Sequence, residues 1–364
     1  MIQYRSIKLN ELEEYIQSSD YLNSDIHPIS KHRANSYITN PRSKKENTVL
    51  ILAKQNGKLL GYIGILPDYI KKIEPIYFGW FSCLWLDENS RGLGIANELI
   101  KKAIEAYNSN IILTEFVPSL YDKYKKIGLF DFEYTMIGTR IYIKSTLRFI
   151  LTKKHPNLTL LKPFLGFLDL FINLGMQAVN FISLRNTKDT IYSELTSFDD
   201  ESTEFINKFN QNRIFNRSIN ELNWIIKYPW ILSPKSIYPE SNKYYFSSIA
   251  DKFEYKIVKV NNFEKRIVGV LFFTSRDGHL KLQYAYYNHS DIHNVMEAIL
   301  SYCFNKDFHT CSIYDKHISA LLQKNSGIIL KKKIYRKYLI SNELKNQFED
   351  NSIIEAGDGD CVFT

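Results

Sequence analysis

The sequence predicts a mixed α/β protein (an α+β mixed sheet) made of two similar halves that are joined by an amphipathic helix. Three observations support this fold class. The first 145 residues alternate between strand-like and helix-like patterns. Residues 191–344 repeat that order of elements without repeating its letters. Residues 163–184, between the two halves, carry one charge, and apart from one stripe of more polar residues at helical spacing they are apolar. A chain of 364 residues is long enough for two domains.

Each element of the first half has a local cause. Asn10 is a good helix N-cap, Asn56-Gly57 between two apolar runs is a strong hairpin signal, and Gly128 can end a helix. The helix after residue 95 follows from apolar residues at helical spacing. The predicted order is a strand at Ile2–Lys8, a helix at Glu11–Gln17, strands at Thr48–Gln55, Lys58–Leu66 and Ile76–Leu86, a helix at Ala96–Tyr107, a strand at Asn110–Phe116, a helix at Leu120–Ile127 and a strand at Thr135–Lys144.

The second half follows the same logic, with Asp277-Gly278 as one of its turns. Its final segment, residues 345–364, is acidic and contains glycine, which predicts a flexible tail. The predicted domains are therefore residues 1–145, a connector at 146–190, residues 191–344 and the tail. The elements predicted for the second half are strands at Ile191–Ser197, Glu254–Val260, Arg266–Ser275, Leu280–Tyr287, Thr310–Tyr314 and Ile334–Ser341, with helices at Ser202–Phe209, Ile292–Phe304 and His317–Lys324.

The connector carries half of the chain's net charge of +8, with six basic residues and two acidic ones. Its uncharged run, Leu170–Leu184, is shorter than the roughly 20 residues of a transmembrane helix. Two interpretations remain open. The connector is either a helix buried between the domains or an interfacial helix that contacts a membrane surface through residues 163–184. In the second case anionic lipid would attract the flanking residues Lys153, Lys154, Lys162, Arg185 and Lys188.

Composition limits the compartment and the partners. Apolar residues make up 45% of the chain and charged residues 24%, as in a globular protein. The four cysteines are scattered and contain no CxxC pair, which favours a reducing cytoplasm and no metal site. The N-terminus lacks the pattern of a secretory signal. Because the excess charge is not spread over one folded domain, we expect no nucleic-acid partner. We expect a cytoplasmic protein that can lie at the inner face of the membrane.

A glycine-rich loop, Arg91-Gly92-Leu93-Gly94-Ile95-Ala96, joins a predicted strand to a predicted helix. Backbone N–H groups and the positive end of a helix dipole then point at one place, which is typical of a phosphate site. Glycine lets the backbone approach the anion closely, and Arg91 adds a fixed positive charge. A Walker A loop is excluded because Gly94 is not followed by Lys and Ser or Thr. A dinucleotide fingerprint does not fit because Asn97 stands in place of its third glycine.

The loop resembles the acyl-CoA loop of the GNAT superfamily of N-acyltransferases, which has Gln or Arg, two variable residues, Gly, one variable residue, and Gly or Ala. Residues Tyr121–Gly128 are similar to a helix end of the same family. The resemblance implies two GNAT-like domains, each with a mostly antiparallel central sheet flanked by helices. The second domain is a degenerate copy, because no glycine loop follows Tyr287. The layout, the connector and the Asp-Gly-Asp-Cys tail look similar to bacterial members associated with surface polysaccharides.

The resemblance also implies site residues. Acetyl-CoA, or another acyl-CoA, would contact Leu84, Trp85 and Leu86 with its pantetheine and Arg91, Gly92, Leu93, Gly94, Ile95 and Ala96 with its pyrophosphate. Tyr124 matches the tyrosine that protonates the departing thiolate. The strand before the loop has no carboxylate to act as the base. Glu115 is our first substitute, since a desolvated carboxylate can have a raised pKa, and Asp68 and His27 are alternatives. His27, Arg33, Asp68 and Trp80 are the predicted substrate contacts.

The predicted function is transfer of an acetyl group from acetyl-CoA to a primary amine by direct attack in a ternary complex. The expected acceptor is an amino sugar, nucleotide-linked or lipid-linked, in surface polysaccharide synthesis. Two alternatives stay open at this point. One is acylation of an amino acid, polyamine or antibiotic amine, or transfer of a longer acyl chain. The other is an acyl-CoA-binding regulatory module that does not catalyse.

Overall fold

The computed structural model describes residues 1–116, 120–184, 190–210, 213–234, 242–306, 308–325, 327–348 and 353–364, and side chains except those of 179–184 and 190. The chain forms two compact units, and neither is continuous in sequence. Unit 1 contains Met1–Thr135, Asn210–Asp251 and Arg336–Thr364, and unit 2 contains Met136–Phe209 and Lys252–Tyr335.

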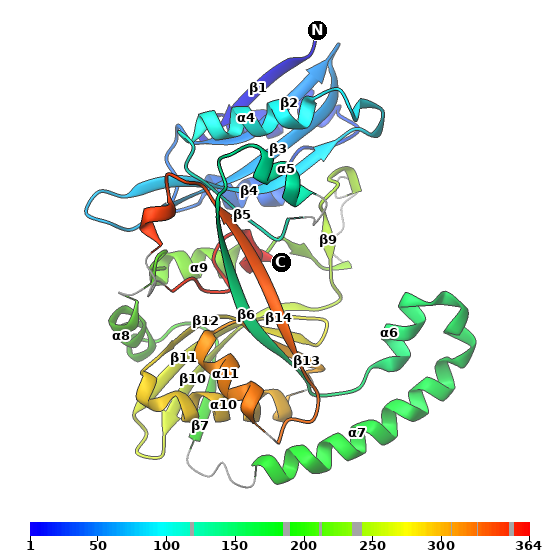
Figure 1. Ribbon diagram of the computed structural model, residues 1–364, viewed down its shortest axis with the longest axis vertical. Helices are drawn as coiled ribbons and strands as arrows, with labels where there is room; N and C mark the ends of the chain where they lie inside the picture. Colours follow the sequence, from blue (N-terminus) through cyan, green and yellow to red (C-terminus); the bar gives the residue numbers. More distant parts are fainter. Residues whose placement is uncertain are drawn as a thin grey trace. The chain divides into compact units, whose positions relative to one another are not determined.

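Unit 1 is built on a sheet with the strand order β1, β2, β3, β4, β5 and β14 (Figure 1). Neighbouring strands are antiparallel, except that β4 and β5 are parallel. The β2–β3 turn uses Asn56 and Gly57, both with positive φ, as the hairpin signal predicts. The strands are β1 (Gln3–Lys8), β2 (Thr48–Gln55), β3 (Lys58–Ile70), β4 (Ile76–Leu86), β5 (Ile111–Thr114) and β14 (Lys331–Ile340).

Helices cover the sheet of unit 1 and supply its core. The buried face of α4 (Ile95–Ala106) carries Leu99 and Ala103, which join an apolar cluster with Ile51, Ile63 and Leu113 of the strands. This burial of one face explains the 3.6-residue period of α4 in the sequence. The other helices of unit 1 are α1 (Leu9–Gln17), α2 (Ser19–Leu22), α3 (Lys31–Ile38), α5 (Tyr121–Lys126) and α9 (Ile219–Lys227), and a small two-stranded sheet joins β8 (Ile231–Leu232) to β9 (Ser248–Ile249).

Unit 2 repeats this plan, which confirms the predicted two-part α/β architecture. Its strands follow the order β6, β13, β12, β11, β10 and β7, and its one parallel pair is β12–β13, which corresponds to β4–β5 in unit 1. Helix α10 fills its core. The elements are β6 (Phe132–Tyr142), β7 (Thr190–Leu195), β10 (Phe253–Asn262), β11 (Ile267–Arg276), β12 (His279–Tyr287) and β13 (Thr310–Ile313), with α8 (Asp200–Phe209), α10 (Ile292–Asn305) and α11 (Lys316–Lys324).

The two halves of the sequence exchange their last strands, so the predicted boundaries at 145 and 191–344 do not describe the compact units. The end of β6 pairs with β13 in unit 2, through Thr139–Tyr142. The end of β14 pairs with β5 in unit 1, through Tyr338–Ile340. The local sequence pattern of a strand indicates that the strand will pair, but it does not indicate with which sheet edge. Every free sheet edge presents the same backbone N–H and C=O groups.

The prediction of a flexible C-terminal tail is wrong for the described residues 354–363. Their side chains are buried, apart from a partly exposed Asp360. Phe363 stacks on Trp230 with ring centroids 4.5 Å apart, and Glu355 forms an ion pair of 2.8 Å with Arg213. The acidic composition is misleading because arginines more than a hundred residues earlier in the sequence, Arg213 and Arg217, pair with Glu355 and Asp358.

The connector forms two helices in unit 2, α6 (Leu147–Lys154) and α7 (Lys162–Leu184), joined by a 3-10 segment at Pro156–Leu161 (Figure 1). Within the described residues, Pro156–Ala178 is the one helical stretch long and apolar enough to cross a membrane, and a window of 18 residues in it has a mean hydropathy of 1.4. Only 11% of this window is buried, which does not fit a core helix. The flanking Arg185 and Lys188 lie outside the described residues.

Candidate active site

Strand β4 departs from regular pairing at Ser82. Against β3, Phe81 pairs with Ile65 and Cys83 with Gly64, so Ser82 is the extra residue of a β-bulge. Against β5, pairing is confined to Gly79–Phe81. Within the described chain, β4 therefore has no strand partner on the β5 side from Ser82 onward, and its main-chain polar groups on that side face an opening.

A cleft of about 670 Å³ occupies this opening, a volume in the range of small-molecule sites. Its walls are the end of β4, the glycine loop, the first turn of α4 and helix α5. All the predicted cofactor residues except Leu93 line it, so the fold brings together Leu84, Trp85, Leu86, Arg91, Gly92, Gly94, Ile95 and Ala96. Tyr245, for which the sequence analysis predicts no role, also lines the cleft. Leu93 projects outward and is 62% exposed.

The glycine loop has the conformation that its sequence requires. Gly92 and Gly94 have φ values of +84° and +77°, a region that other residues rarely adopt. Gly94 is the N-cap of α4, and its carbonyl accepts a hydrogen bond from the N–H of Glu98 at 3.1 Å. The first N–H groups of a helix have no acceptor within the helix. Because those of α4 border the cleft, its wall suits an anion such as pyrophosphate.

Tyr124 lies on α5 and lines the same cleft. Its ring is buried to 95% and makes edge contacts with Phe116 and Phe130. Burial raises the pKa of Tyr124 to about 12, so the hydroxyl keeps its proton at neutral pH. A neutral phenol beside the cleft can donate a proton to a leaving anion, which fits the role predicted for it.

The sequence reasoning missed a second carboxylate, Asp360, at the point where β4 and β5 diverge. The Ser82 hydroxyl donates a hydrogen bond of 2.5 Å to Asp360, and the Arg33 guanidinium in turn donates to Ser82. Burial raises the pKa of Asp360, although Arg33 and Ser82 act against this rise, and the charge of Glu115 adds to it. The Asp-Gly-Asp-Cys motif held the signal, but its place in the fold depends on a contact between residues 278 positions apart.

The environment of Glu115 does not match the desolvated site predicted for a catalytic base. It follows β5 with φ of +52°, and its carboxylate forms an ion pair of 2.7 Å with Arg336. Its side chain is 49% exposed, so the desolvation on which we based its assignment as a base is missing. The environment of Arg33 does not match that of the predicted substrate contact either. Its guanidinium is buried against Trp230 and donates to Tyr37, Cys83, Tyr244 and Ser82, so it holds protein groups in place.

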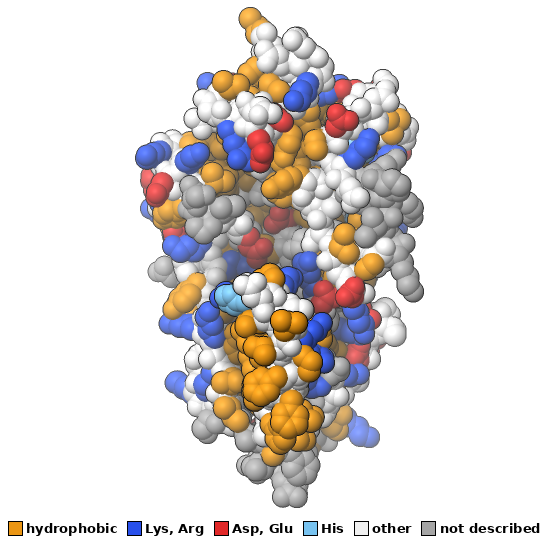
Figure 2. Space-filling view, turned by 90° about the vertical axis from the view of Figure 1, so that its right-hand side faces the viewer, with side chains coloured by type: hydrophobic (Ala, Val, Ile, Leu, Met, Phe, Trp, Pro, Cys, Tyr) orange, Lys and Arg blue, Asp and Glu red, His pale blue; other side chains and the backbone are white. Residues whose placement is uncertain are grey.

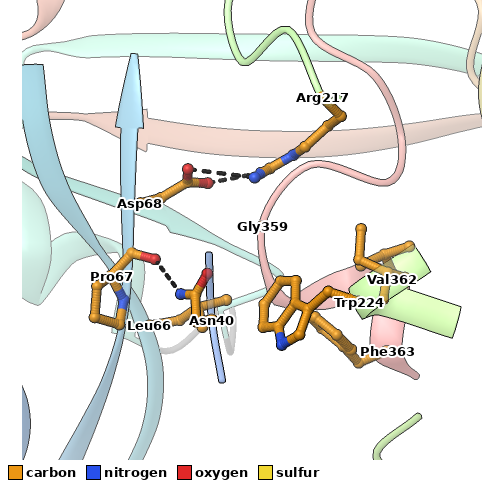
Figure 3. Close-up of a pocket in the computed structure, with 10 residues that line it drawn as sticks. Asn40, Leu66, Pro67, Asp68, Arg217, Trp224, Gly359, Val362 and Phe363 are labelled. Carbon is orange, nitrogen blue, oxygen red and sulfur yellow. Dashed lines mark hydrogen bonds and ion pairs between the residues drawn. The ribbon is translucent and has the colours of Figure 1, made fainter. Parts of the chain in front are cut away.

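Asp68 is the centre of a buried ion cluster rather than a substrate contact or a base. Arg217 approaches it to 2.6 Å, Arg42 also donates to it, and the indole N–H of Trp80 donates at 2.9 Å. Burial by itself raises the pKa of Asp68, but Arg217 and Arg42 outweigh it and lower the pKa to about 2. The neighbouring cavity, shown in Figure 3, holds only about 10 Å³, room for about one water.

Two more predicted substrate contacts lie in the core. Trp80 is 1% exposed, so its ring is not available to stack on a sugar. His27 is 2% exposed and stacks on Tyr21 at a centroid distance of 4.1 Å. Their polar or aromatic character predicts a contact with substrate, but the same residue types serve equally to fill a core. Among the described residues, no group of three or more His, Cys, Asp or Glu side chains could hold a metal ion.

Comparisons with known proteins agree with this geometry. Residues 11–121 match the model of the GNAT acetyltransferase family. No curated protein sequence matches the chain significantly. Among solved structures, a conserved protein of unknown function from Enterococcus faecalis V583, described as a probable N-acyltransferase, superposes with a TM-score of 0.53 and 9% identity. That alignment covers 93% of this chain and 73% of the other.

Two further structures are more distant. A tandem GNAT protein from the clavulanic acid biosynthesis pathway gives a TM-score of 0.48 at 8% identity, over 93% of this chain and 98% of that one. The N-myristoyltransferase of Saccharomyces cerevisiae with bound myristoyl-CoA gives 0.47 at 11% identity, over 94% and 82%. The fold comparison therefore rests on the enterococcal protein.

The strand divergence, the glycine loop and the family match together define the class of the protein. Its first unit has a cleft bordered by the glycine loop, inside the segment that matches an acetyltransferase family. Residues 11–121, under a third of the chain, match the GNAT acetyltransferase family, and the glycine loop and the cleft lie in or beside this matched segment.

Proposed function

We propose that the protein transfers an acetyl group from acetyl-CoA to a primary amine in the cleft of unit 1. The observation that carries this proposal is the cleft itself, where the unpaired edge of β4 meets the glycine loop and Tyr124. The loop amides and Arg91 bind the pyrophosphate, and the edge of Leu84–Leu86 pairs with the amides of the pantetheine. These contacts place the thioester towards Ser82, where β4 and β5 diverge.

The reaction needs a base and an acid on this surface. The amine nitrogen attacks the thioester carbonyl carbon, a C–N bond forms and the C–S bond breaks. Asp360 accepts the proton that the amine loses, and Ser82 and Arg33 hold its carboxylate in place. Tyr124 gives its proton to the departing thiolate, and the proton held by Asp360 then returns to the Tyr124 phenolate through water, which restores both groups. Asp360 thereby takes the role first given to Glu115, because Asp360 combines a raised pKa with a position at the strand divergence.

Two conservative variants separate these bases. Asp360→Asn should lower kcat by about 10²-fold or more, with the affinity for CoA unchanged and the rise of activity with pH flattened. Glu115→Gln should stay within a few-fold of the wild type. Release of free thiol from acetyl-CoA measures both. If Glu115→Gln loses activity and Asp360→Asn does not, the base is Glu115.

For the acceptor we propose an amino sugar, nucleotide-linked or lipid-linked, on the way to a surface polysaccharide. The support is the likeness of the layout, the connector and the C-terminal motif to bacterial members of that kind. The test is thiol release with a panel of amines. Turnover of amino-sugar nucleotides but not of spermidine or free amino acids supports the assignment, and the reverse preference refutes it. Tight acetyl-CoA binding without turnover of any amine would instead indicate a regulatory module.

A further inference from the structure

The α6–α7 hairpin presents a broad apolar face to solvent. Figure 2 shows hydrophobic side chains gathered over it in one patch, with Lys and Arg at its margins. Single exposed apolar residues are ordinary, but a contiguous group of this extent marks an interaction site. Ten side chains between 37% and 91% exposed form this apolar face: Phe149, Ile150, Leu160, Leu161, Phe164, Phe167, Leu170, Phe171, Ile172 and Leu174.

The charge beside the apolar face has one sign. In residues 146–178, Arg148, Lys153, Lys154 and Lys162 are exposed, and the single acidic residue, Asp169, is buried. Its carboxylate accepts hydrogen bonds from the Ser145 hydroxyl at 2.6 Å and from two backbone N–H groups at the start of α6. The carboxylate of Asp169 is therefore buried inside the hairpin. The exposed charged side chains of residues 146–178 are all basic, and they surround the apolar face.

The topology favours a helix that lies on a membrane over one that crosses it. The strands on either side of the hairpin, β6 and β7, belong to the sheet of unit 2. Asp169, about one turn before the middle of α7, is hydrogen-bonded to the segment that follows β6, so a crossing would carry these polar groups into the hydrocarbon core. Only five residues join α7 to β7, a reach of about 18 Å against a hydrocarbon core of about 30 Å.

We propose that the α6–α7 hairpin docks unit 2 on an anionic lipid surface, with its apolar face in the interface and its lysines against the headgroups. An apolar helix face bordered by basic residues is the pattern that binds such surfaces. Each lysine near an anionic surface strengthens binding by about fivefold at low salt. The inference is independent of the acceptor, because it depends on the hairpin alone. It would bring the enzyme to the inner face of the membrane.

The test is flotation of the full-length protein with vesicles of phosphatidylcholine alone or mixed with phosphatidylglycerol, in low and high salt. We expect binding to the anionic vesicles that weakens as salt rises. Phe167→Ser should weaken it by about tenfold, and the pair Lys153→Gln and Lys154→Gln by about 25-fold at low salt. The matched controls lie on the β10–β11 turn of unit 2. Phe263, which is 68% exposed, should tolerate serine, and the exposed Lys265 should tolerate glutamine.

Because the changed residues are exposed, all variants should keep the wild-type melting temperature, which thermal unfolding checks. Failure to bind anionic vesicles at low salt overturns the proposal. Equal losses for Phe167→Ser and Phe263→Ser also overturn it, since the hairpin would then have no special role. A concentration-dependent dimer that Phe167→Ser dissociates, without vesicle binding, assigns the face to a second copy of the chain instead.

Discussion

Replacement of Gly94 by alanine tests whether the loop holds an anion, because the chain contains a matched control. Gly94 has φ of +77° and Gly57, at the β2–β3 turn, has φ of +80°, and a Cβ at either position would meet no atom within 4 Å. The two substitutions therefore cost similar backbone strain, about 1–2 kcal/mol. Each should lower the melting temperature by a few degrees, since about 1 kcal/mol corresponds to 2–4 °C for a unit of this size.

Only Gly94 borders the cleft, so only its substitution should weaken CoA binding. A Cβ at position 94 would occupy the space through which the anion approaches the backbone. The anion would then lose its contact with at least one backbone N–H group. A hydrogen bond to a charged group contributes about 1.5–3 kcal/mol, which corresponds to about 10–150-fold in Kd. Calorimetric titration with CoA gives the affinity of each variant, and thermal unfolding gives the strain.

Pantetheine provides a further control, because it lacks the pyrophosphate and should bind the two variants equally. If Gly94→Ala and Gly57→Ala bind CoA with equal affinity, the loop does not cradle the anion and the assignment of the cleft is wrong. If Gly94→Ala loses much more stability than Gly57→Ala, the loop has a structural role instead. The open space around Gly94 does not predict such a role.

Three further predictions concern single side chains. Tyr124→Phe should lower kcat by about 10²–10⁴-fold with CoA affinity unchanged, and a wild-type kcat would exclude Tyr124 as the acid. Asp68→Asn removes the carboxylate that two buried guanidinium groups share, although Arg42 keeps Glu221 and Arg217 keeps Asp358 as a partner, and should cost about 1.5–3 kcal/mol in urea unfolding. Asn at the more exposed Asp20 should cost under about 1 kcal/mol, and equal costs would contradict the cluster's role. Burial raises the pKa of Asp358 to about 6, and this effect outweighs the positive charge of Arg217, which lowers the pKa. The folded state then binds more protons than the unfolded state, so this group adds stability as the pH falls from about 7 to 4, and Asp358→Asn should remove that gain; an unchanged pH dependence of unfolding would contradict the shift.

The elements of the candidate site that are close in sequence could be predicted from it. The strand β4, the glycine loop and the start of α4 are consecutive, and their patterns specify a phosphate-binding turn without any distant partner. Tyr124 followed from the next helix for the same reason. These residues meet at one cleft in the structure.

Asp360 and the buried cluster around Asp68 could not be predicted in this way. Asp360 reaches Ser82, and Asp68 reaches Arg217, across 278 and 149 residues. A polar residue in a sequence gives no sign of whether a distant opposite charge will bury it. For that reason the sequence predicts a substrate contact for Asp68, Trp80 and His27, whereas Asp68 lies in a buried ion cluster and the other two lie in the core.

By itself the sequence determined the two-part α/β plan, the class of the glycine loop and the apolar, basic character of the connector, because each depends on residues a few positions apart. Only the tertiary structure decided that the halves exchange their last strands, that the acidic C-terminus is buried with Asp360 hydrogen-bonded to Ser82, and that the connector's apolar face is exposed. The physical reason is the same in each case. Backbone pairing and charge neutralisation are satisfied by any suitable partner, and only the folded chain selects which one comes within reach.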